Sequence, residues 1–335
     1  MNQEPLFSFN DVLIEPIFSN VRSRKDVDAS TEFLNMKLSL PVVCSNMDTV
    51  SSPELCRALA DYGTIGTLHR FWSIEQNVKA FVDSISPNSG YGPIVSIGIG
   101  DKEFERAKAL YKVGAARFML DVAHSANIAV VEMYNKLTKE FPLCNFIVGD
   151  FGTGQEIHEF LKRVDMKPDA VKVGISVGSV CVTRLTTGVG TPALSCLQDC
   201  ADTLDDWSSL KDIKLVLDGG VKYYGDIAKA LIAGADLVIS GSMFAGTEEA
   251  PGEFVDNGSG KFKAYRGSAS HESYVVQNKT ANWRAPEGIA TLIPYKGPVL
   301  KVLNEINGAL KSSCSYVNAF NLNELKANGK FRFVK

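Results

Sequence analysis

The 335-residue sequence has little that would mark it as a nucleic-acid-binding, secreted or membrane protein. Its formal net charge is only −3, so it lacks the basic excess with which DNA- and RNA-binding proteins attract phosphate. Its N-terminus lacks a basic segment followed by an apolar one, and its most apolar stretch, residues 227–246, is interrupted by Asp236 and by glycines. We therefore expect no nucleic-acid partner, no membrane contact and a cytoplasmic location.

Patterned metal or disulfide sites are also missing. The seven cysteines are odd in number and contain no Cys-x-x-Cys pair, and the four histidines show no metal-ligand spacing. Reduced thiols are the expected state. No Gly-x-Gly-x-x-Gly follows a strand and opens a helix, so a dinucleotide would not bind as it does in a Rossmann fold.

What the sequence does contain is a series of short apolar runs, each followed by Gly, Asp, Asn or Ser and separated by segments of helical periodicity. Continuous apolar strands that alternate with helices indicate parallel β/α units. Eight such units predict a (β/α)8 TIM barrel, an α/β fold, over a doubly wound open sheet. The runs are residues 40–47, 63–69, 93–100, 116–123, 145–150, 170–175, 214–220 and 236–242.

No linker or low-complexity stretch divides the chain, which predicts one domain over residues 1–335 with no inserted regulatory domain. The region from about residue 244 to 335 is too long for one helix and is expected to extend the barrel. It contains a predicted hairpin or flap within residues 252–267, where the sequence DNGSG reads as a turn, and a final helix over residues 297–313.

Polar residues gather where the predicted strands end. Barrel enzymes place their active sites at the C-terminal ends of the strands, so these positions are the candidate site. They are Asn46, Asp48, His69, Gly100, Asp121, His124, Asp150, Cys181, Asp218, Gly241 and Ser242.

Two neighbouring strand ends have the composition of a phosphate site. Asp218 is followed by Gly219 and Gly220, and the next strand ends in the sequence Ser-Gly-Ser at 240–242. Small residues let backbone N–H groups approach phosphate oxygens, and barrels bind phosphate after strands seven and eight. Asp218 could accept hydrogen bonds from ribose hydroxyls. Together these features predict a nucleoside monophosphate as ligand.

Cys181 lies in the glycine- and hydroxyl-rich stretch GISVGSVCVTRLTTGVG at 174–190, between a strand end and the next helix. A thiolate attacks electron-poor carbons well, whereas most cysteines are buried and inert, as we expect for the other six. Far along the chain, Glu287 lies between Pro286 and Gly288, where a carboxylate could act as an acid or base or could be a surface residue.

Several long motifs resemble the IMP dehydrogenase/GMP reductase family. They are FSFNDVLIEP, SNMDTV, VKVGISVGSVCVTRLTTGVG, LDGGVKYYGDIAKALIAGADLVISGSMFAGTEEAPGE, YRG, and PEGI followed by PYKGPV. The resemblance implies a (β/α)8 barrel that assembles as a homotetramer. Residues 73–98 pass straight into the third strand without a regulatory insertion, the segment between YRG and PEG is short, and the sequence SSCSYVNAFNLNEL is similar to the reductase pattern. These three features favour GMP reductase.

The resemblance implies an NADPH-dependent reductive deamination of GMP to IMP and ammonia. Cys181 would form a thioimidate with the purine, and Thr183 and Glu287 would relay protons. The nucleotide would be held by Ser179, Asp218, Gly219, Gly220, Gly241, Ser242, Gly267, Ser268, Arg284 and Gly288. The cofactor would contact Asp121, Val122, Ala123, Arg70, Ser23, Arg24, Ser313, Cys314, Ser315 and Tyr316. Carbonyl groups of Gly178, Cys181 and Arg184 would offer oxygen ligands to potassium.

Four positions depart from the family pattern. Ser176 and Val177 replace a Gly and a Pro before Cys181, Asp150 replaces an Asn, and Ser268 replaces a Met. Because a β-branched Val does not readily adopt a positive φ, the loop and its cation site are expected to differ. Three alternatives stay open: an IMP dehydrogenase without its regulatory domain, a reductase for a deoxy or modified purine nucleotide, and a nucleotide-binding protein without activity.

Overall fold

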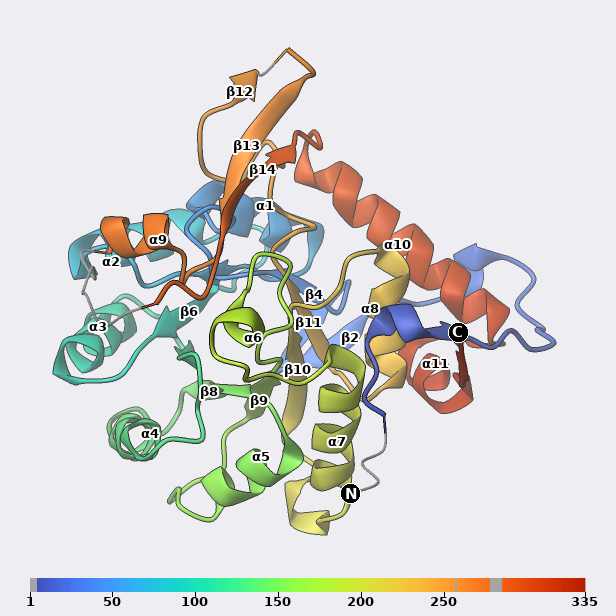
Figure 1. Ribbon diagram of the computed structural model, residues 1–335, viewed down its shortest axis with the longest axis horizontal. Coiled ribbons are helices and arrows are strands. Elements are labelled where there is room, and N and C mark those ends of the chain that lie inside the picture. The colour runs from blue at the N-terminus through green and yellow to red at the C-terminus, as the bar shows by residue number, and fades with distance from the viewer. Residues whose placement is uncertain (1–4, 257, 278–284, 335) are drawn as a thin grey trace.

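The computed structural model describes residues 5–256, 258–277 and 285–334, and its centre is a sheet of eight parallel strands (Figure 1). Their order is β4-β11-β10-β9-β8-β7-β6-β5. Between the two end strands, the Thr67 hydroxyl donates to the Cys44 carbonyl at 2.6 Å, so the sheet nearly closes. The predicted barrel is confirmed. Its strands are β4 (Val42–Cys44), β5 (Thr67–Leu68), β6 (Ile94–Ile97), β7 (Arg117–Asp121), β8 (Asn145–Phe151), β9 (Ala170–Val173), β10 (Lys214–Asp218) and β11 (Leu237–Ser240).

Helices follow the strands and cover the outside of the barrel. Side-chain oxygens of Ser52, Ser73 and Thr153 each accept a backbone N–H at a helix start, as N-cap residues do. The connection from α2 to β6 is only residues 85–93, so no further domain is inserted there. The helices of this layer are α1 (Pro53–Tyr62), α2 (Ile74–Ser84), α3 (Asp101–Lys112), α4 (Ile128–Glu140), α5 (Gly154–Leu161), α7 (Ala193–Asp205) and α8 (Tyr224–Ile232). The short helix α6 (Thr183–Thr186) lies in the connection between β9 and α7.

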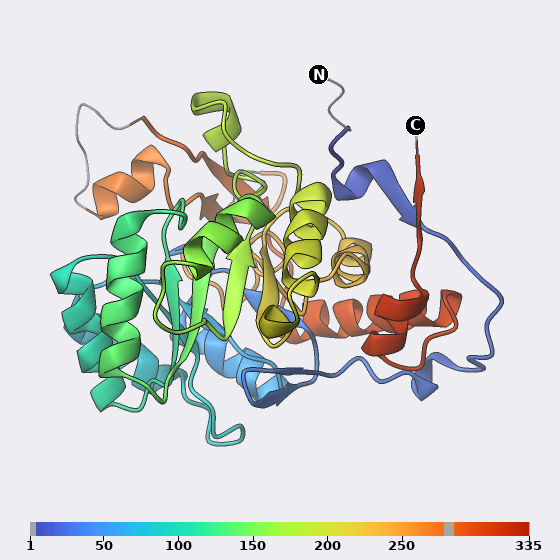
Figure 2. The same ribbon diagram turned by 90° about the horizontal axis from the view of Figure 1, so that it is seen from below.

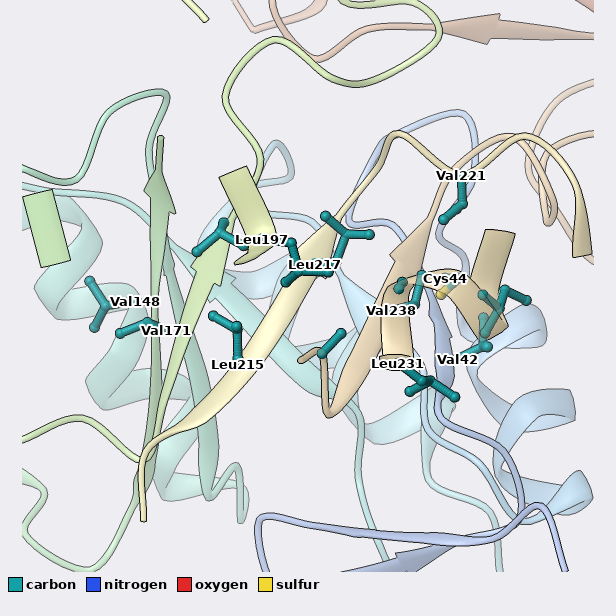
Figure 3. Packing of buried hydrophobic residues seen from close by; sticks show 14 of the residues in the cluster. Val42, Cys44, Val148, Val171, Leu197, Leu215, Leu217, Val221, Leu231 and Val238 are labelled. Atoms are coloured by element: carbon teal, nitrogen blue, oxygen red, sulfur yellow. The ribbon is translucent and has the colours of Figure 1, made fainter. Parts of the chain in front are cut away.

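The alternation of side chains along each strand creates two apolar cores. Outward-facing residues pack against the helices, and Figure 3 shows Leu215 and Leu217 of β10 in this layer with Leu197 of α7 and Leu231 of α8. Inward-facing residues such as Val216 form a separate core inside the barrel. Successive side chains of a strand point to opposite faces of the sheet, so each strand contributes to both cores. Such strands are buried on both faces.

A hairpin that the sequence analysis did not predict closes the N-terminal end of the barrel. Strands β2 (Thr31–Phe33) and β3 (Met36–Leu38) pair antiparallel, and Leu34 and Asn35 between them both have positive φ. The side chains of Phe33, Leu34, Met36 and Leu38 are buried with the inward-facing barrel residues. We call these four residues the apolar plug.

The chain after β11 adds structure beside the barrel. β12 (Val255–Asp256) pairs with β13 (Lys261–Arg266), and β14 (Ala290–Pro294) extends this antiparallel sheet by an unpredicted third strand. The elements α9 (His271–Val276), α10 (Val299–Tyr316) and α11 (Leu322–Asn328) follow. β15 (Phe331–Phe333) pairs with β1 (Val12–Ile14), which brings the first and the last strand of the chain together (Figure 2). Within the described ranges, no helix has the length and apolarity needed to cross a membrane.

Candidate active site

A cavity of about 370 Å³ opens at the C-terminal ends of the barrel strands. It brings together residues that lie up to 243 positions apart in the chain, from Ser45 to Gly288. The predicted site residues that line it are Arg70, Asp121, Val122, Ala123, Gly178, Ser179, Cys181, Thr183, Asp218, Gly219, Gly220, Gly241, Ser242, Gly267, Ser268, Glu287 and Gly288, and from the strand ends Asn46 and Asp150.

Cys181 is the one partly exposed cysteine of the seven, and the six others are buried. Its Sγ lies 3.2 Å from the hydroxyl oxygen of Thr183, at the first residue of α6. A buried thiol is inert for want of access, whereas a partly exposed thiol beside a hydroxyl can reach a ligand and exchange a proton. Cys181 thus differs from the other six cysteines in burial, as predicted.

The loop that carries Cys181 is held by a side chain at the position where it departs from the family pattern. Ser176 has a φ of +66°, whereas Val177 is not among the positive-φ residues of the described chain. The Ser176 hydroxyl accepts the backbone N–H of Arg184 at 2.7 Å. The turn that Val177 was expected to obstruct is therefore made one residue earlier, and it is tied to α6 across Cys181.

Backbone pairing brings Glu287 to the Cys181 loop. The N–H of Val182 donates to the Glu287 carbonyl at 2.8 Å, and the N–H of Ile289 donates to the Val180 carbonyl at 2.9 Å. Cys181 and Gly288 face each other in this short antiparallel pair. Glu287, whose role the local sequence left ambiguous, thus lines the cavity.

The glycines after β10 and β11 fit a close approach by backbone. Gly219 and Gly220 have φ values of +82° and +76°, which residues other than glycine rarely adopt. A Cβ on Gly241 would lie 2.7 Å from the Tyr265 hydroxyl, so a side chain has no room there. Tyr265, which the sequence analysis did not single out, lines the cavity with its hydroxyl 3.4 Å from that of Ser179.

At the inner end of the cavity, the ammonium group of Lys172 on β9 contacts three carboxylates. Its Nζ lies 2.9 Å from Asp121 on β7, 2.6 Å from Asp150 at the end of β8 and 2.7 Å from Asp218 on β10. The Lys172 side chain is fully buried. Three oxygen atoms of the acids lie within 4.8 Å of one another, a spacing that would suit a metal ion, but the ammonium group already contacts all three. We call these four residues the lysine cluster.

Burial and charge act in opposite directions in the lysine cluster. Burial works against a charged Lys172, but the three carboxylates raise its pKa well above the usual value. Burial likewise opposes an ionised Asp121, yet Lys172 and Arg70 hold its pKa below the usual value. Lys172 was missed in the sequence analysis. The signal for it was a lysine inside the apolar strand sequence AVKV, where only a paired charge is tolerated.

Four residues at the predicted strand ends do not line the cavity. Asp48 instead pairs with Arg266 at 2.5 Å, and Gly100 is the N-cap of α3. His69 is buried, accepts the Phe71 N–H at 3.1 Å, and has a pKa that burial lowers to about 3, with further lowering from Arg106 and Arg266. His124 lies 3.3 Å from Glu156 on the surface.

The remaining predicted site residues lie elsewhere. Arg184 lines a second cavity, of about 570 Å³, on the other side of the loop, together with Gly178 and Cys181. Arg284 falls outside the described residues. Ser23, Arg24, Ser313, Cys314, Ser315 and Tyr316 line neither cavity; they belong to the start of the 3₁₀ turn Arg24–Asp26 and to the last turn of α10, which pack against each other.

The chain is similar to known proteins over nearly its whole length. The model of the IMP dehydrogenase / GMP reductase domain matches residues 6–335. The chain is 34% identical to a GMP reductase of Caenorhabditis elegans, over 99% of this chain and 92% of that protein. It is 36% identical to the GMP reductases of Shigella boydii, over 96% and 93%, and of Aeromonas salmonicida, over 98% and 94%.

Proposed function

This chain belongs to the IMP dehydrogenase/GMP reductase family, a family of oxidoreductases, and we propose that it reduces GMP to IMP and ammonia with NADPH. The observation that carries the proposal is the placement of Cys181. Of seven cysteines it alone is partly exposed, it lies 3.2 Å from Thr183, and it shares a cavity with Glu287 and with both glycine loops. Names of the relatives support the direction of the reaction.

In the proposed reaction, the Cys181 sulfur forms a bond to C2 of the guanine base. The C2–N bond to the amino group then breaks, and ammonia leaves with a proton that the base itself does not supply. Thr183, in contact with the sulfur, and Glu287, across the loop pair, are the groups placed to move protons between thiol and amine. The product of this exchange is a thioimidate, which becomes IMP when a hydride reaches C2 and the sulfur departs with its bonding electrons.

The nucleotide is proposed to bind along the β9 to β11 side of the cavity. The ribose would hydrogen-bond to Asp218, and the phosphate would approach the backbone N–H groups of Gly220 and Gly241, where no side chain intervenes. The N–H of Gly219 already donates to the Ile239 carbonyl at 3.0 Å. The hydroxyls of Ser179 and Ser242 line the same wall. Backbone N–H groups with positive-φ glycines form the kind of concave donor surface that phosphate favours.

The residues on the β5 to β7 side fit the nicotinamide cofactor, which supplies the hydride when bound. Arg70 lines the cavity, and its buried Nε–H has no hydrogen-bond partner among the described residues. An unpaired buried donor is costly, so a ligand that accepts from Arg70 would relieve it. Asp121, Val122 and Ala123 line the wall beside Arg70.

The other cofactor residues predicted from the sequence imply a second copy of the chain. Ser23, Arg24 and the Ser313–Tyr316 turn line neither cavity, and the Cys314 side chain is fully buried. If these residues contact the cofactor, they do so from a neighbouring subunit, as a homotetramer would allow. Seven free cysteines fit a reducing compartment such as the cytoplasm.

A potassium ion fits the second cavity in part. The Gly178 carbonyl accepts one N–H group, at 3.1 Å, and keeps one lone pair, whereas the Arg184 carbonyl already accepts from both Thr187 and Gly188. Carbonyl oxygens suit such a cation, but three from one loop do not complete a shell. The ion would then stabilise the loop, and it has no part in the proton transfers above.

The test is a nucleotide screen with purified protein. We expect GMP to drive consumption of NADPH and release of ammonia, and we expect IMP with NAD to give little turnover. Cys181→Ala should lower kcat on the order of a thousandfold or more. Cys144→Ala, a buried cysteine outside both cavities, is the matched control and should keep kcat.

Each other result of the screen selects an alternative. Faster oxidation of IMP with NAD would assign a dehydrogenase, and preference for a deoxy or modified purine monophosphate would change the substrate. Nucleotide binding with no turnover of any purine monophosphate would indicate a binding protein. Full activity of Cys181→Ala would rule out the thioimidate.

A further inference from the structure

The lysine cluster contains more negative charge than its own cations balance. Lys172 has three N–H donors, and each carboxylate takes one of them. One positive charge therefore faces three acids, at the inner end of a cavity that is proposed to bind a phosphate and a pyrophosphate-containing cofactor. Like charges this close cannot all persist at low dielectric, so one acid is expected to bind a proton.

Two of the three acids, Asp121 and Asp218, have a further hydrogen-bond partner or a proposed contact with the nucleotide. Asp121 accepts the side-chain N–H of Asn46 at 2.9 Å, and its backbone carbonyl accepts from the Arg70 guanidinium at 3.4 Å. Asp218 precedes Gly219 and Gly220 on the proposed nucleotide side. Among the described residues, the Asp150 carboxylate accepts a hydrogen bond only from Lys172.

Strand order places Asp150 between the other two acids. β8 lies between β7, which carries Asp121, and β9, which carries Lys172, and β10 with Asp218 follows. Burial raises the pKa of Asp150 to about 8; Lys172 opposes this, and Asp218 and Asp121 add to it. Its backbone is also held, since its N–H donates to the Val122 carbonyl at 3.0 Å and its carbonyl accepts from Ser125 at 2.8 Å.

We propose that Asp150 binds ligand as a neutral carboxylic acid, donating a hydrogen bond into the cavity, and that loss of this proton weakens binding of the anionic nucleotide and cofactor. A protonated carboxyl group offers one donor and one acceptor, whereas the ionised group only accepts and adds a negative charge. The proposal rests on the proposed function for the identity of the ligands. The proton on Asp150 does not depend on it.

Other charged groups around the cavity must be separated from Asp150 in any pH experiment. They are Lys172, Asp121 and Asp218 in the cluster, Arg70 beside Asp121, Cys181 and Glu287 in the loops across the cavity, and the pair of His124, on the loop after β7, with Glu156, on α5. Each of them is present in both the natural chain and a variant changed only at Asp150. A comparison of the two therefore isolates the one carboxyl group.

The first experiment measures kcat/KM for GMP against pH from 6 to 10. For the natural chain we expect a decline of about tenfold per pH unit above about pH 8, expressed mainly in KM. Asp150→Asn keeps a donor and an acceptor without titrating, so its profile should lack this decline. Asp101→Asn, which changes a carboxylate that is 96% exposed, should match the natural chain. The proposal is overturned if Asp150→Asn retains the alkaline decline or if the natural chain has none.

The second experiment does not need turnover. Infrared spectra of the natural protein with carbon-13 aspartate should show the carbonyl stretch of a protonated carboxyl at pH 6.5, lost above pH 8. Asp150→Asn should lack this band. If no purine nucleotide is reduced but the band is present at pH 6.5, disappears above pH 8 and is absent from Asp150→Asn, the proposed function fails while the proton on Asp150 is supported. Absence of the band at pH 6.5 overturns the proton itself.

Discussion

The two ends of the barrel interior are filled by side chains of opposite character, apolar at one end and ionisable at the other. At the N-terminal end, the apolar plug, Phe33, Leu34, Met36 and Leu38, fills the barrel with hydrocarbon. At the C-terminal end, the lysine cluster places four ionisable groups at the inner end of the cavity. The plug packs against apolar barrel residues and needs no ligand, whereas the cluster has unbalanced negative charge that protons or ligands can relieve.

This difference fits the division of labour in barrel enzymes, in which one end serves stability and the other serves the reaction. Inward-facing residues on the same strand illustrate it. On β9, Ala170 contacts the plug side of the core, and Lys172, two residues later, belongs to the cavity side. A single step of the strand period therefore separates the apolar interior from the charged one.

The largest effect is expected from Lys172→Met, which removes the cation of the lysine cluster. Three acids would then face one another without a buried partner, and breaking such a network costs about 3–5 kcal/mol. Because the acids can bind protons instead, the loss should shrink as pH falls towards 5 and grow as it rises towards 8. Denaturant unfolding at several pH values measures this, and activity should be lost throughout. A loss independent of pH would contradict the charge imbalance.

A loss of similar size but different character is expected from Phe33→Ala in the apolar plug. Phe33 is 1% exposed, and truncating a buried phenylalanine costs about 3–5 kcal/mol because a cavity remains. No titratable group is removed, so the loss should be the same at pH 5 and pH 8. At a temperature where the variant is folded, kcat for GMP should stay within about twofold of the natural value. A large drop in kcat would show that the two ends are coupled.

How far the sequence predicts each end follows from how local its signals are. The eight barrel strands were predictable because continuous apolar runs end in Gly, Asp or Ser. The plug hairpin was not, since its strands have three residues each and its positive-φ turn contains Leu34 and Asn35 rather than glycine. Tertiary packing in the barrel, rather than turn chemistry, holds that hairpin in place.

The residues of the site likewise divide into those that the sequence predicts and those that it does not. Glycine motifs and the position of Cys181 could be predicted from the sequence alone, and Glu287 only with the family resemblance. The partners of Lys172 could not be predicted, because Asp121, Asp150 and Asp218 lie on three different strands and meet only when the sheet curves. The positive φ of Ser176 was also missed, since Val177 beside it was the residue expected to disturb the loop.

The smallest effect on stability is expected from substitutions at Ser176, in the loop that carries Cys181. Ser176→Ala and Ser176→Gly both remove the hydroxyl that accepts the Arg184 N–H, which should lower stability by about 1 kcal/mol. Glycine also relieves the strain of a φ of +66°, so the Gly variant should be more stable than the Ala variant by about 1 kcal/mol. Thermal unfolding of the two variants measures this difference directly.

Activity should follow a different order from stability. If the Ser176 hydroxyl orients Cys181, both variants should lose kcat by about tenfold, and the more stable Gly variant should not recover it. Phe33→Leu, a mild change in the apolar plug, provides a variant whose small stability loss leaves kcat unchanged. Equal kcat in the natural chain and both Ser176 variants would mean that the strand pairing with residues 287–289 positions Cys181 without help from Ser176.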